Sequence, residues 1–443
     1  MKLALWSPLP PAASGIADFA AEQLPALAAR VDLSVVVHDP AAVDPGLAAR
    51  FRILAPEPRP AADLDLYHVG NSPAHAYAYR AALAQPGVVA LHDVSLHHLV
   101  LSETVERDDT AAYRRQMRAA YGATGAFVAG QVARALGGAI LPALYPLNEH
   151  LLDAALAVVT LSRSAAERVR PALNGRPLLA LPHHLALPLD PVPSQDQARR
   201  ELGLPTDALI VTAPGLATAS KRLDVVIPVV ARLRPRFPSL RLVVAGAVEP
   251  QLPLAEWSRA AGLGEALVVS GRVSLPDFER HLAAADVVLA LRFPSFGEMS
   301  GAAVRALGVG RATLVTAGSP AALEFPEGVL VPIDPGPTES EELHATLARL
   351  LDDAPLRESL GRLARSHVLE AHRLEDGVGT LVAFLEEVRA RKAELVEVTL
   401  AARHAEDGLT GRYLEELRHA ARSLGLASVP ADVVGLLREL GAP

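Results

Sequence analysis

The chain has 443 residues, 50% of them hydrophobic and 21% charged, with a formal net charge of −8 and no cysteine. This balance predicts a globular protein of more than one domain and excludes disulfides, thiolate nucleophiles and thiolate metal sites. The negative charge argues against nucleic acid as a partner, because phosphate backbones are bound by clustered lysine and arginine. No apolar stretch approaches the roughly 20 residues that span a bilayer. The apolar run Leu3–Trp6 is too short for the core of a signal peptide, so we expect a cytoplasmic protein.

Short apolar runs alternate with alanine-rich helical stretches along most of the chain, which predicts an α/β fold with parallel sheets covered by helices on both faces. The strands expected in the first half are Leu3–Trp6, Asp32–His38, Leu64–Gly70, Val88–His92, Ala154–Leu161 and Pro177–Leu181. Those expected in the second half are Ala208–Thr212, Leu240–Ala245, Ala266–Ser270, Val287–Leu291, Ala312–Thr316 and Val329–Ile333. Each set is enough for a six-stranded sheet of its own.

A proline-rich segment separates the two sets of strands. Leu187–Asp196 contains three prolines and no periodicity, which indicates a linker. We therefore predict two Rossmann-like domains, over 1–190 and 191–375. Only helices are expected after Pro335, with a long helix over 376–405 that would cross back to the N-terminal domain and a helical extension over 406–443. This extension carries no recognisable chemistry, and its helices would either mediate self-association or cap a domain.

Ligands of open α/β sheets bind outside the carboxyl ends of the strands, where helix N-termini offer unpaired N–H groups. After the first strand, Ser14 is expected to cap a helix that starts at Gly15, and Gly15 would let an anionic ligand approach the backbone. The loop lacks the G-x-G-x-x-G pattern of dinucleotide sites. A proline-stiffened turn without a ligand is the alternative interpretation.

A His–Asp pair ends the strand that begins at Val88. His92 and Asp93 are placed for a polar role in a cleft, such as orienting a hydroxyl group. His97 and His98 follow closely, but their spacing matches no metal-ligand motif, so we predict no metal site. These two histidines are expected on the next helix as ordinary polar residues.

The loop after the first strand of the second set is rich in cations. Gly215 turns the chain, Ser220 is expected to cap the next helix, and Lys221 and Arg222 would stand at the start of that helix. A cation there opposes the helix dipole unless an anion, such as a diphosphate, lies nearby. Solvated surface charge is the alternative.

A second candidate loop follows the strand that ends at Leu291. It carries Glu298, and Ser300 and Gly301 open a helix whose first N–H groups would hold phosphate. Glu298 would accept hydrogen bonds from sugar hydroxyls, and a simple capping role is the alternative.

Taken together, these segments resemble the family-4 retaining glycosyltransferases, which have the GT-B fold, over most of residues 1–335. The matching pieces are Pro-x-x-Ser-Gly-Ile-Ala-Asp-Phe ending at Phe19, Leu91-His92-Asp93, Arg199–Pro205 followed by a strand with Gly215 and Lys221, Ser270–Val273, Ala285-Asp286 and a Gly-Glu-x-Ser-Gly block ending at Gly301. The resemblance implies Lys221 on the donor diphosphate, Glu298 on donor sugar hydroxyls, amides of Ser300 and Gly301 on phosphate, Arg272 and Val273 beside the nucleobase, and His92 lining the sugar site. Gly15 and Ile16 would approach the phosphates when the cleft closes.

Two positions depart from the family pattern. The second of two glutamates, normally eight positions after the first, is replaced here by Arg305-Ala306, seven after Glu298. The arginine that usually follows the turn glycine is Leu216, and Arg222 is the candidate substitute for it.

The expected activity is metal-independent, retaining transfer of a hexose from a nucleotide-diphosphate sugar (UDP- or GDP-sugar) to a glycan, lipid-linked or small-molecule acceptor, as in bacterial glycan biosynthesis. No cofactor is expected besides this co-substrate. A catalytically inactive nucleotide- or glycan-binding protein of the same fold is the main alternative. A nucleotide-sugar epimerase would need a carboxylate–histidine set that is not evident.

Membrane contact is a further alternative that the sequence leaves open. The arginines of residues 107–118 are interleaved with Asp108 and Asp109, so we interpret this stretch as a solvated face, with weak peripheral membrane contact as the alternative.

Overall fold

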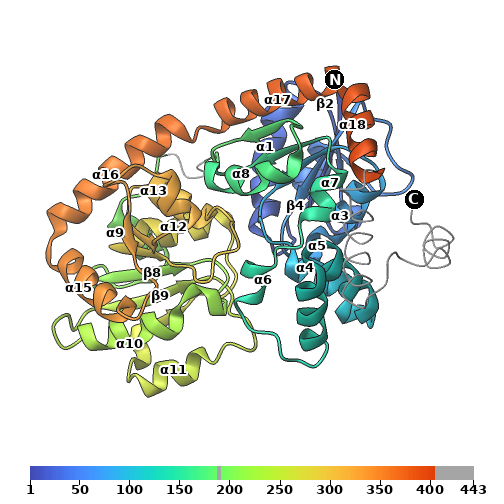
Figure 1. Ribbon diagram of the computed structural model, residues 1–443. Helices are drawn as coiled ribbons and strands as arrows, with labels where there is room; N and C mark the ends of the chain where they lie inside the picture. Colours follow the sequence, from blue (N-terminus) through green and yellow to red (C-terminus); the bar gives the residue numbers. More distant parts are fainter. Residues whose placement is uncertain (187–190, 405–443) are drawn as a thin grey trace. The chain divides into compact units, whose positions relative to one another are not determined.

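The computed structural model describes residues 1–186 and 191–404 (Figure 1). The chain divides into two compact units, one of Met1–Leu181 with the segment from Val378 onward, the other of Pro182–Gly377. Part of the predicted linker and the extension predicted for 406–443 lie outside the described residues. Within the described residues, no helix is long and apolar enough to cross a membrane.

The first unit is built on a seven-stranded, all-parallel sheet of strand order β3-β2-β1-β4-β5-β6-β7. The strands are β1 Lys2–Trp6, β2 Asp32–Val36, β3 Arg52–Leu54, β4 Leu64–Val69, β5 Val88–Leu91, β6 Ala157–Thr160 and β7 Leu178–Ala180. Six were predicted. The missed strand, β3, is only three residues long and lies at the edge beside β2, with Arg52 exposed. An edge strand with no buried face leaves no hydrophobic pattern to recognise.

The second unit has the predicted six strands, again all parallel, in the order β10-β9-β8-β11-β12-β13. They are β8 Ile210–Pro214, β9 Arg241–Ala245, β10 Leu267–Val269, β11 Val287–Ala290, β12 Ala312–Thr316 and β13 Val331–Ile333. The central strands are buried on both faces, because helices cover both sides of a parallel sheet.

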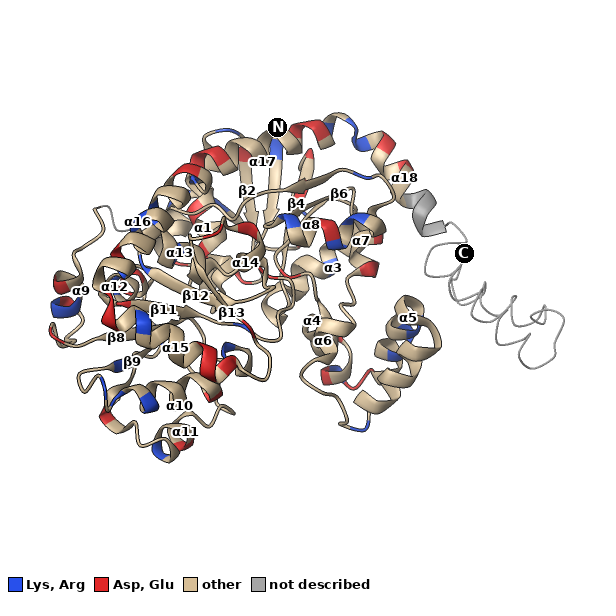
Figure 2. Cartoon of the chain, turned by 60° about the vertical axis from the view of Figure 1, so that its left-hand side comes forward, with Lys and Arg blue, Asp and Glu red and all other residues tan. Residues whose placement is uncertain are grey.

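Helices connect the strands in both units. Those of the first unit are α1 Gly15–Ala28, α2 Pro45–Arg50, α3 Ala76–Ala84, α4 His97–Glu103, α5 Thr110–Val132, α6 Leu141–Leu144, α7 Glu149–Ala154 and α8 Arg163–Val169. Those of the second are α9 Gln195–Glu201, α10 Leu223–Leu233, α11 Leu254–Ala260, α12 Leu275–Ala284, α13 Gly301–Val309, α14 Pro320–Glu324, α15 Glu339–Asp352 and α16 Ala354–Ala371. Figure 2 shows both signs of charge interspersed on α15 and α16.

Two helices occupy the region where one long helix was predicted. α17 (Leu374–Ala390) and α18 (Lys392–His404) are separated at Arg391. α18 is attached to the first unit, because Nζ of Lys392 donates to the carbonyl of Asp63 at 2.7 Å and the Thr399 hydroxyl is 3.5 Å from the carbonyl of Ala155. The final helix of the described chain therefore packs with residues from its beginning.

The strand orders locate the loops that matter for binding. In the first unit the order reverses between β1 and β4, and in the second between β8 and β11. At such switch points two neighbouring loops leave in opposite directions and open a crevice at the carboxyl ends of the strands. The loops after β1, β4, β8 and β11 are therefore where ligand-binding residues are expected.

Candidate active site

The most unusual side chain at the switch point of the second unit is a buried lysine. β8 ends at Pro214, Gly215 turns the chain with φ +86°, and a 3₁₀ turn over Ala219–Lys221 brings Lys221 back toward the strand end. The residue is only 8% exposed, and its ammonium donates to the carbonyl of Pro214 at 2.9 Å. A Cβ at position 215 would stand 3.6 Å from this nitrogen, so glycine keeps the space above the ammonium open.

Burial dominates the electrostatics of Lys221. Burial and, to a smaller extent, the nearby Arg292 lower the pKa of the ammonium and Glu298 raises it, which together bring it to about 7. The pKa falls because the charged form loses hydration that a single carbonyl does not replace. An anion bound next to this buried ammonium would stabilise its charged form.

The loop after β11 supplies a carboxylate to the same place. Nη1 of Arg292 and the backbone N–H of Phe296 each donate to Glu298 at 2.6 Å. The N–H of Phe293 donates to the carbonyl of Ser220 at 2.8 Å, which ties this loop to the 3₁₀ turn that carries Lys221. Lys221, Arg292 and Glu298 thus form one cluster across the switch point. Lys221 and Glu298 were predicted site residues. Arg292 was not singled out, although it is the first charged residue after the apolar strand.

The helix that follows presents N–H groups at this edge. The Ser300 hydroxyl accepts from the N–H of Ala303 at 3.2 Å, as an N-cap does. The N–H groups of Gly301 and Ala302 make no hydrogen bond within the described residues. His183 was not foreseen here. Its Nε2 would lie 3.2 Å from a Cβ at position 301, so the buried imidazole packs closely against the helix start and leaves little room for a side chain there.

Arg222 and Ser220 do not lie as the simplest sequence interpretation predicts. Ser220 does not cap α10, since Arg222 itself is the N-cap residue, with φ +58°, and the Ser220 hydroxyl pairs with Thr218 at 2.9 Å. Nε of Arg222 lies 3.1 Å from a carboxylate oxygen of the buried Glu339, and its Nη1 lies 3.2 Å from Asp224. Two carboxylates therefore hold Arg222, and a phosphate would have to share its guanidinium with them.

The residues predicted beside the nucleobase also lie at the carboxyl ends of the strands, farther from the switch point. Arg272 and Val273 follow β10, the edge strand of the sheet, after Gly271 with φ +69°. Arg272 is exposed and Val273 is partly buried. β9 lies between β10 and β8, so these residues are one strand removed from the Lys221 loop.

The first unit gathers a separate set of predicted residues at its own switch point. Ser14 caps α1 as predicted, accepting from the N–H of Ile16 at 3.2 Å, and a Cβ at Gly15 would meet nothing within 4 Å. The Ile16 side chain packs against Gly70 at the end of β4, and Asp93 accepts from the N–H of Asn71 at 2.7 Å.

The predicted His92 is a buried residue among rings. It is 8% exposed, and its ring centroid lies 5.3 Å from Phe19 and 4.8 Å from His68. His97 and His98 begin α4 as predicted, but His97 is fully buried and bonded to the Tyr113 hydroxyl at 2.9 Å and the Tyr145 carbonyl at 2.6 Å. In the part of the chain that the structure describes, no three side chains of His, Asp or Glu gather as metal ligands.

Replacing Gly246 by alanine is expected to damage the Lys221 loop. A Cβ there would overlap the Gly215 carbonyl and lie 2.5 Å from its carbon, and the residue has φ +157°. We expect a loss of about 2–3 kcal/mol of unfolding free energy and weaker binding of an anion at Lys221, since Gly215 must move. Chemical denaturation and a titration with inorganic diphosphate measure both. Gly130→Ala, in open space in α5, is the control and should not lower stability. Unchanged stability of the Gly246 variant would contradict the close approach.

Comparison with known proteins bears on the second unit directly. Residues 194–367 match the sequence model of the family described as glycosyl transferases group 1. These residues are therefore similar to group 1 glycosyltransferases. The Lys221, Arg292 and Glu298 cluster and the start of α13 all lie inside the matched residues. No curated protein sequence matches the chain.

Solved structures resemble both units at low identity. Sucrose-phosphate synthase from Thermosynechococcus elongatus is 15% identical, with a TM-score of 0.62 over 88% of this chain and 99% of that one. HepE from Anabaena, in complex with UDP and glucose, is 13% identical, with a TM-score of 0.60 over 87% and 100%. WaaG, a glycosyltransferase involved in lipopolysaccharide biosynthesis, is 17% identical, with a TM-score of 0.58 over 86% and 99%. These similarities establish the GT-B fold that the sequence predicted.

Proposed function

We propose that the protein transfers a hexose from a nucleotide-diphosphate sugar to an acceptor, with retention of configuration and without a metal ion. The observation that carries the proposal is the buried ammonium of Lys221 in the matched residues, beside open N–H groups at the start of α13. A diphosphate supplies the negative charge that this place lacks. A uridine nucleotide is the first donor to test, because HepE was crystallised with UDP-glucose.

In the proposed reaction the bond between the anomeric carbon and the diphosphate breaks, and negative charge grows on the leaving phosphate. Lys221 and the N–H groups of Gly301 and Ala302 stabilise this charge more strongly in the transition state than in the bound donor. Glu298, held by Arg292 and the N–H of Phe296, accepts hydrogen bonds from sugar hydroxyls. The leaving phosphate takes the proton of the acceptor hydroxyl. Arg272 and Val273 contact the base, and Arg222 contributes at longer range.

The first unit would supply the acceptor side. Gly15 and Ile16 approach the phosphates, and His92 and Asp93 line the sugar site at the carboxyl ends of β4 and β5. The acceptor is a glycan, a lipid-linked sugar or a small molecule. Weak peripheral membrane contact through α5, where Arg114 and Arg115 are exposed, belongs to this proposal, as does self-association through the C-terminal helices.

The test is incubation of the purified protein with a panel of UDP- and GDP-sugars in EDTA, while release of the nucleoside diphosphate is followed. Release from one donor, with an α-linked product from an α-linked donor by proton NMR, supports the proposal. Inversion, or dependence on an added divalent metal, would overturn the corresponding part of it. Tight donor binding without release, across many acceptors, would favour the binding protein, for which Arg305 in place of a second glutamate is the argument.

Donor binding should depend on pH because of Lys221. Its pKa is about 7 in the ligand-free site, and a bound diphosphate raises it, so the complex retains the proton to higher pH. Affinity is therefore greatest below the ligand-free pKa and falls up to about tenfold per pH unit above it. Calorimetry in two buffers of different ionisation enthalpy should detect uptake of protons on binding at pH 8. Lys221→Met should abolish this uptake, and a pH-independent affinity of the native protein would contradict the assignment.

A further inference from the structure

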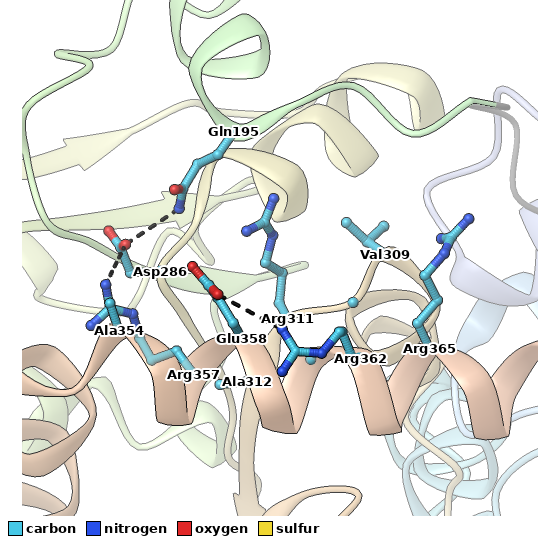
Figure 3. Close-up of a pocket in the computed structure, with 12 residues that line it drawn as sticks. Gln195, Asp286, Val309, Arg311, Ala312, Ala354, Arg357, Glu358, Arg362 and Arg365 are labelled. Atoms are coloured by element: carbon cyan, nitrogen blue, oxygen red, sulfur yellow. Dashed lines mark hydrogen bonds and ion pairs between the residues drawn. The ribbon is translucent and has the colours of Figure 1, made fainter.

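The second unit contains a second cationic cluster, at the amino ends of its strands. Asp286 immediately precedes β11 and Arg311 immediately precedes β12, so both lie where the parallel strands begin, away from Lys221. A cavity of about 300 Å³ opens there (Figure 3). Its polar lining includes Asp286, Arg311, Arg357, Glu358, Arg362 and Arg365.

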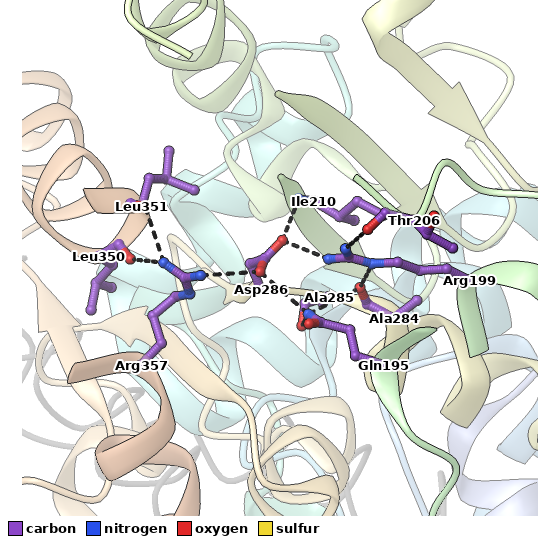
Figure 4. A network of polar contacts seen from close by, with 10 residues as sticks. All are labelled: Gln195, Arg199, Thr206, Ile210, Ala284, Ala285, Asp286, Leu350, Leu351 and Arg357. Atoms are coloured by element: carbon purple, nitrogen blue, oxygen red, sulfur yellow. Dashed lines mark hydrogen bonds and ion pairs between the residues drawn. The ribbon is translucent and has the colours of Figure 1, made fainter. Parts of the chain in front are cut away.

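The carboxylate of Asp286 is already fully engaged (Figure 4). It accepts from Nη2 of Arg199 and from the N–H of Ile210 at 2.8 and 2.7 Å, and from Gln195 and Arg357 at 3.3 Å each. Two guanidinium groups and two neutral donors share this single negative charge. Asp286 therefore has little capacity left for a third guanidinium.

Arg311 is the guanidinium that is left over. It makes no side-chain hydrogen bond and no ion pair with any described residue, and its Nε is buried without a partner. Figure 3 shows its guanidinium among the lining residues with no dashed line to it. Burial, with smaller contributions from Arg199 and Arg357, lowers the pKa of Arg311 to about 10 despite Asp286. Positive charge is thus in excess around this cavity.

The neighbouring groups do not remove the excess. Arg365 donates to the carbonyl of Gly308, and Arg362 has only the exposed Glu358 at 3.7 Å. Five arginines, those at 199, 311, 357, 362 and 365, face two carboxylates, Asp286 and Glu358. A guanidinium binds a phosphate through parallel hydrogen bonds, and a buried guanidinium without such bonds is costly.

We propose that this cavity binds a small phosphate-bearing anion, with Arg311 as its central contact and Arg362 and Arg365 at its rim. The site is separate from the proposed donor site, which lies at the carboxyl ends of the same strands. The volume holds a phosphate group with a body the size of a sugar ring. Bound there, the anion connects α16, which carries Arg362 and Arg365, to the start of β12. Binding would therefore stabilise the domain.

The test is thermal unfolding with increasing inorganic phosphate, and separately with a hexose 6-phosphate, at ionic strength held constant with sodium chloride. Saturable stabilisation of the native protein is expected, with binding about tenfold weaker in Arg311→Gln and about threefold weaker in Arg362→Gln. Arg362 is 72% exposed, so its variant tests the site without disturbing the fold. Arg259→Gln removes the same charge from an exposed position of α11 and should behave as the native protein. Tighter binding of the hexose phosphate would extend the proposal to the body of the ligand.

Two results would overturn the proposal. Equal stabilisation of all variants would mean that phosphate acts by bulk screening. Loss of the effect in Lys221→Ala with retention in Arg311→Gln would place the phosphate in the proposed donor site. Conversely, a phosphate effect that survives in Lys221→Ala supports the second site even where no transferase activity is found.

Discussion

Replacing Lys221 by alanine is expected to lower kcat/KM for the donor by about 10²–10³-fold, because the variant loses the buried cation that the proposed function places against the leaving diphosphate. The decrease should be divided between kcat and KM, since the charge on the phosphate is present in the donor and grows in the transition state. Steady-state release of nucleoside diphosphate from the donor identified in the panel measures it.

The control for charge alone is Arg259→Ala, which removes an exposed cation from the same domain and should leave kcat/KM within a factor of two or so. Lys221→Ala should also be more stable than the native protein without ligand, by on the order of 2 kcal/mol, because a poorly solvated ammonium has been removed. An unchanged kcat/KM in Lys221→Ala would refute the phosphate assignment, whatever the stability shows.

Removing Glu279 is expected to have the largest effect on folding. Glu279 in α12 is fully buried and accepts from Nη1 of Arg305 at 2.9 Å, and Arg305 is itself only 6% exposed. Glu279→Gln would leave the guanidinium buried without a compensating charge, at a cost of about 3–5 kcal/mol of unfolding free energy. Urea denaturation monitored by circular dichroism measures the loss.

The double variant Glu279→Leu with Arg305→Met is the matched control. It removes both charges and should recover most of the stability, because a buried ion pair replaced by apolar groups is often close to neutral. If both variants lost the same free energy, packing and not charge would be the cause. Arg305→Glu, which restores the residue type of the family pattern, would put two carboxylates together and should destabilise the fold without restoring any function.

This pair gives a structural reason for the departure at position 305. The Arg305 side chain is committed inside the domain, to Glu279 and to the carbonyl of Ala186 at 3.1 Å. The sequence showed only that the second glutamate of the family pattern was missing from the helix that follows the Glu298 loop. It did not show that a compensating carboxylate had been placed in α12, because the two residues are 26 positions apart and nothing local connects them.

The fold was largely predictable because its strands are continuous apolar runs, buried on both faces, separated by helical stretches. The loops that follow them could be assigned for the same reason, and Lys221, Glu298 and the helix at Gly301 lie at the switch point of the second sheet. Short edge strands such as β3 leave no such pattern. The Ser220 cap was wrong because a 3₁₀ turn and a left-handed Arg222 precede α10, and a local sequence does not fix that backbone choice.

The remaining features depend on partners distant in sequence. Arg292 could be placed after a strand, but its pairing with Glu298 depends on the path of the loop. Arg222 was predicted as a phosphate-binding cation, but its pairing with Glu339 could not be predicted because α15 brings that residue to it from 117 positions away. The cavity around Arg311 combines a strand start with one face of α16, so no single stretch of sequence signals it.

The contacts of Asp286 also determine how the second unit of the structure holds together during folding. One carboxylate joins α9, at the entry of the domain, to β8 through the N–H of Ile210 and to α16, near its exit, through Arg357. Both ends of this unit therefore bind the same carboxylate. Unfolding of either end would break an ion pair of Asp286 and expose a buried charge. Local fraying of α9 or α16 is therefore coupled to opening of the sheet edge, so both helices should exchange their amide hydrogens as one cooperative unit with the central strands.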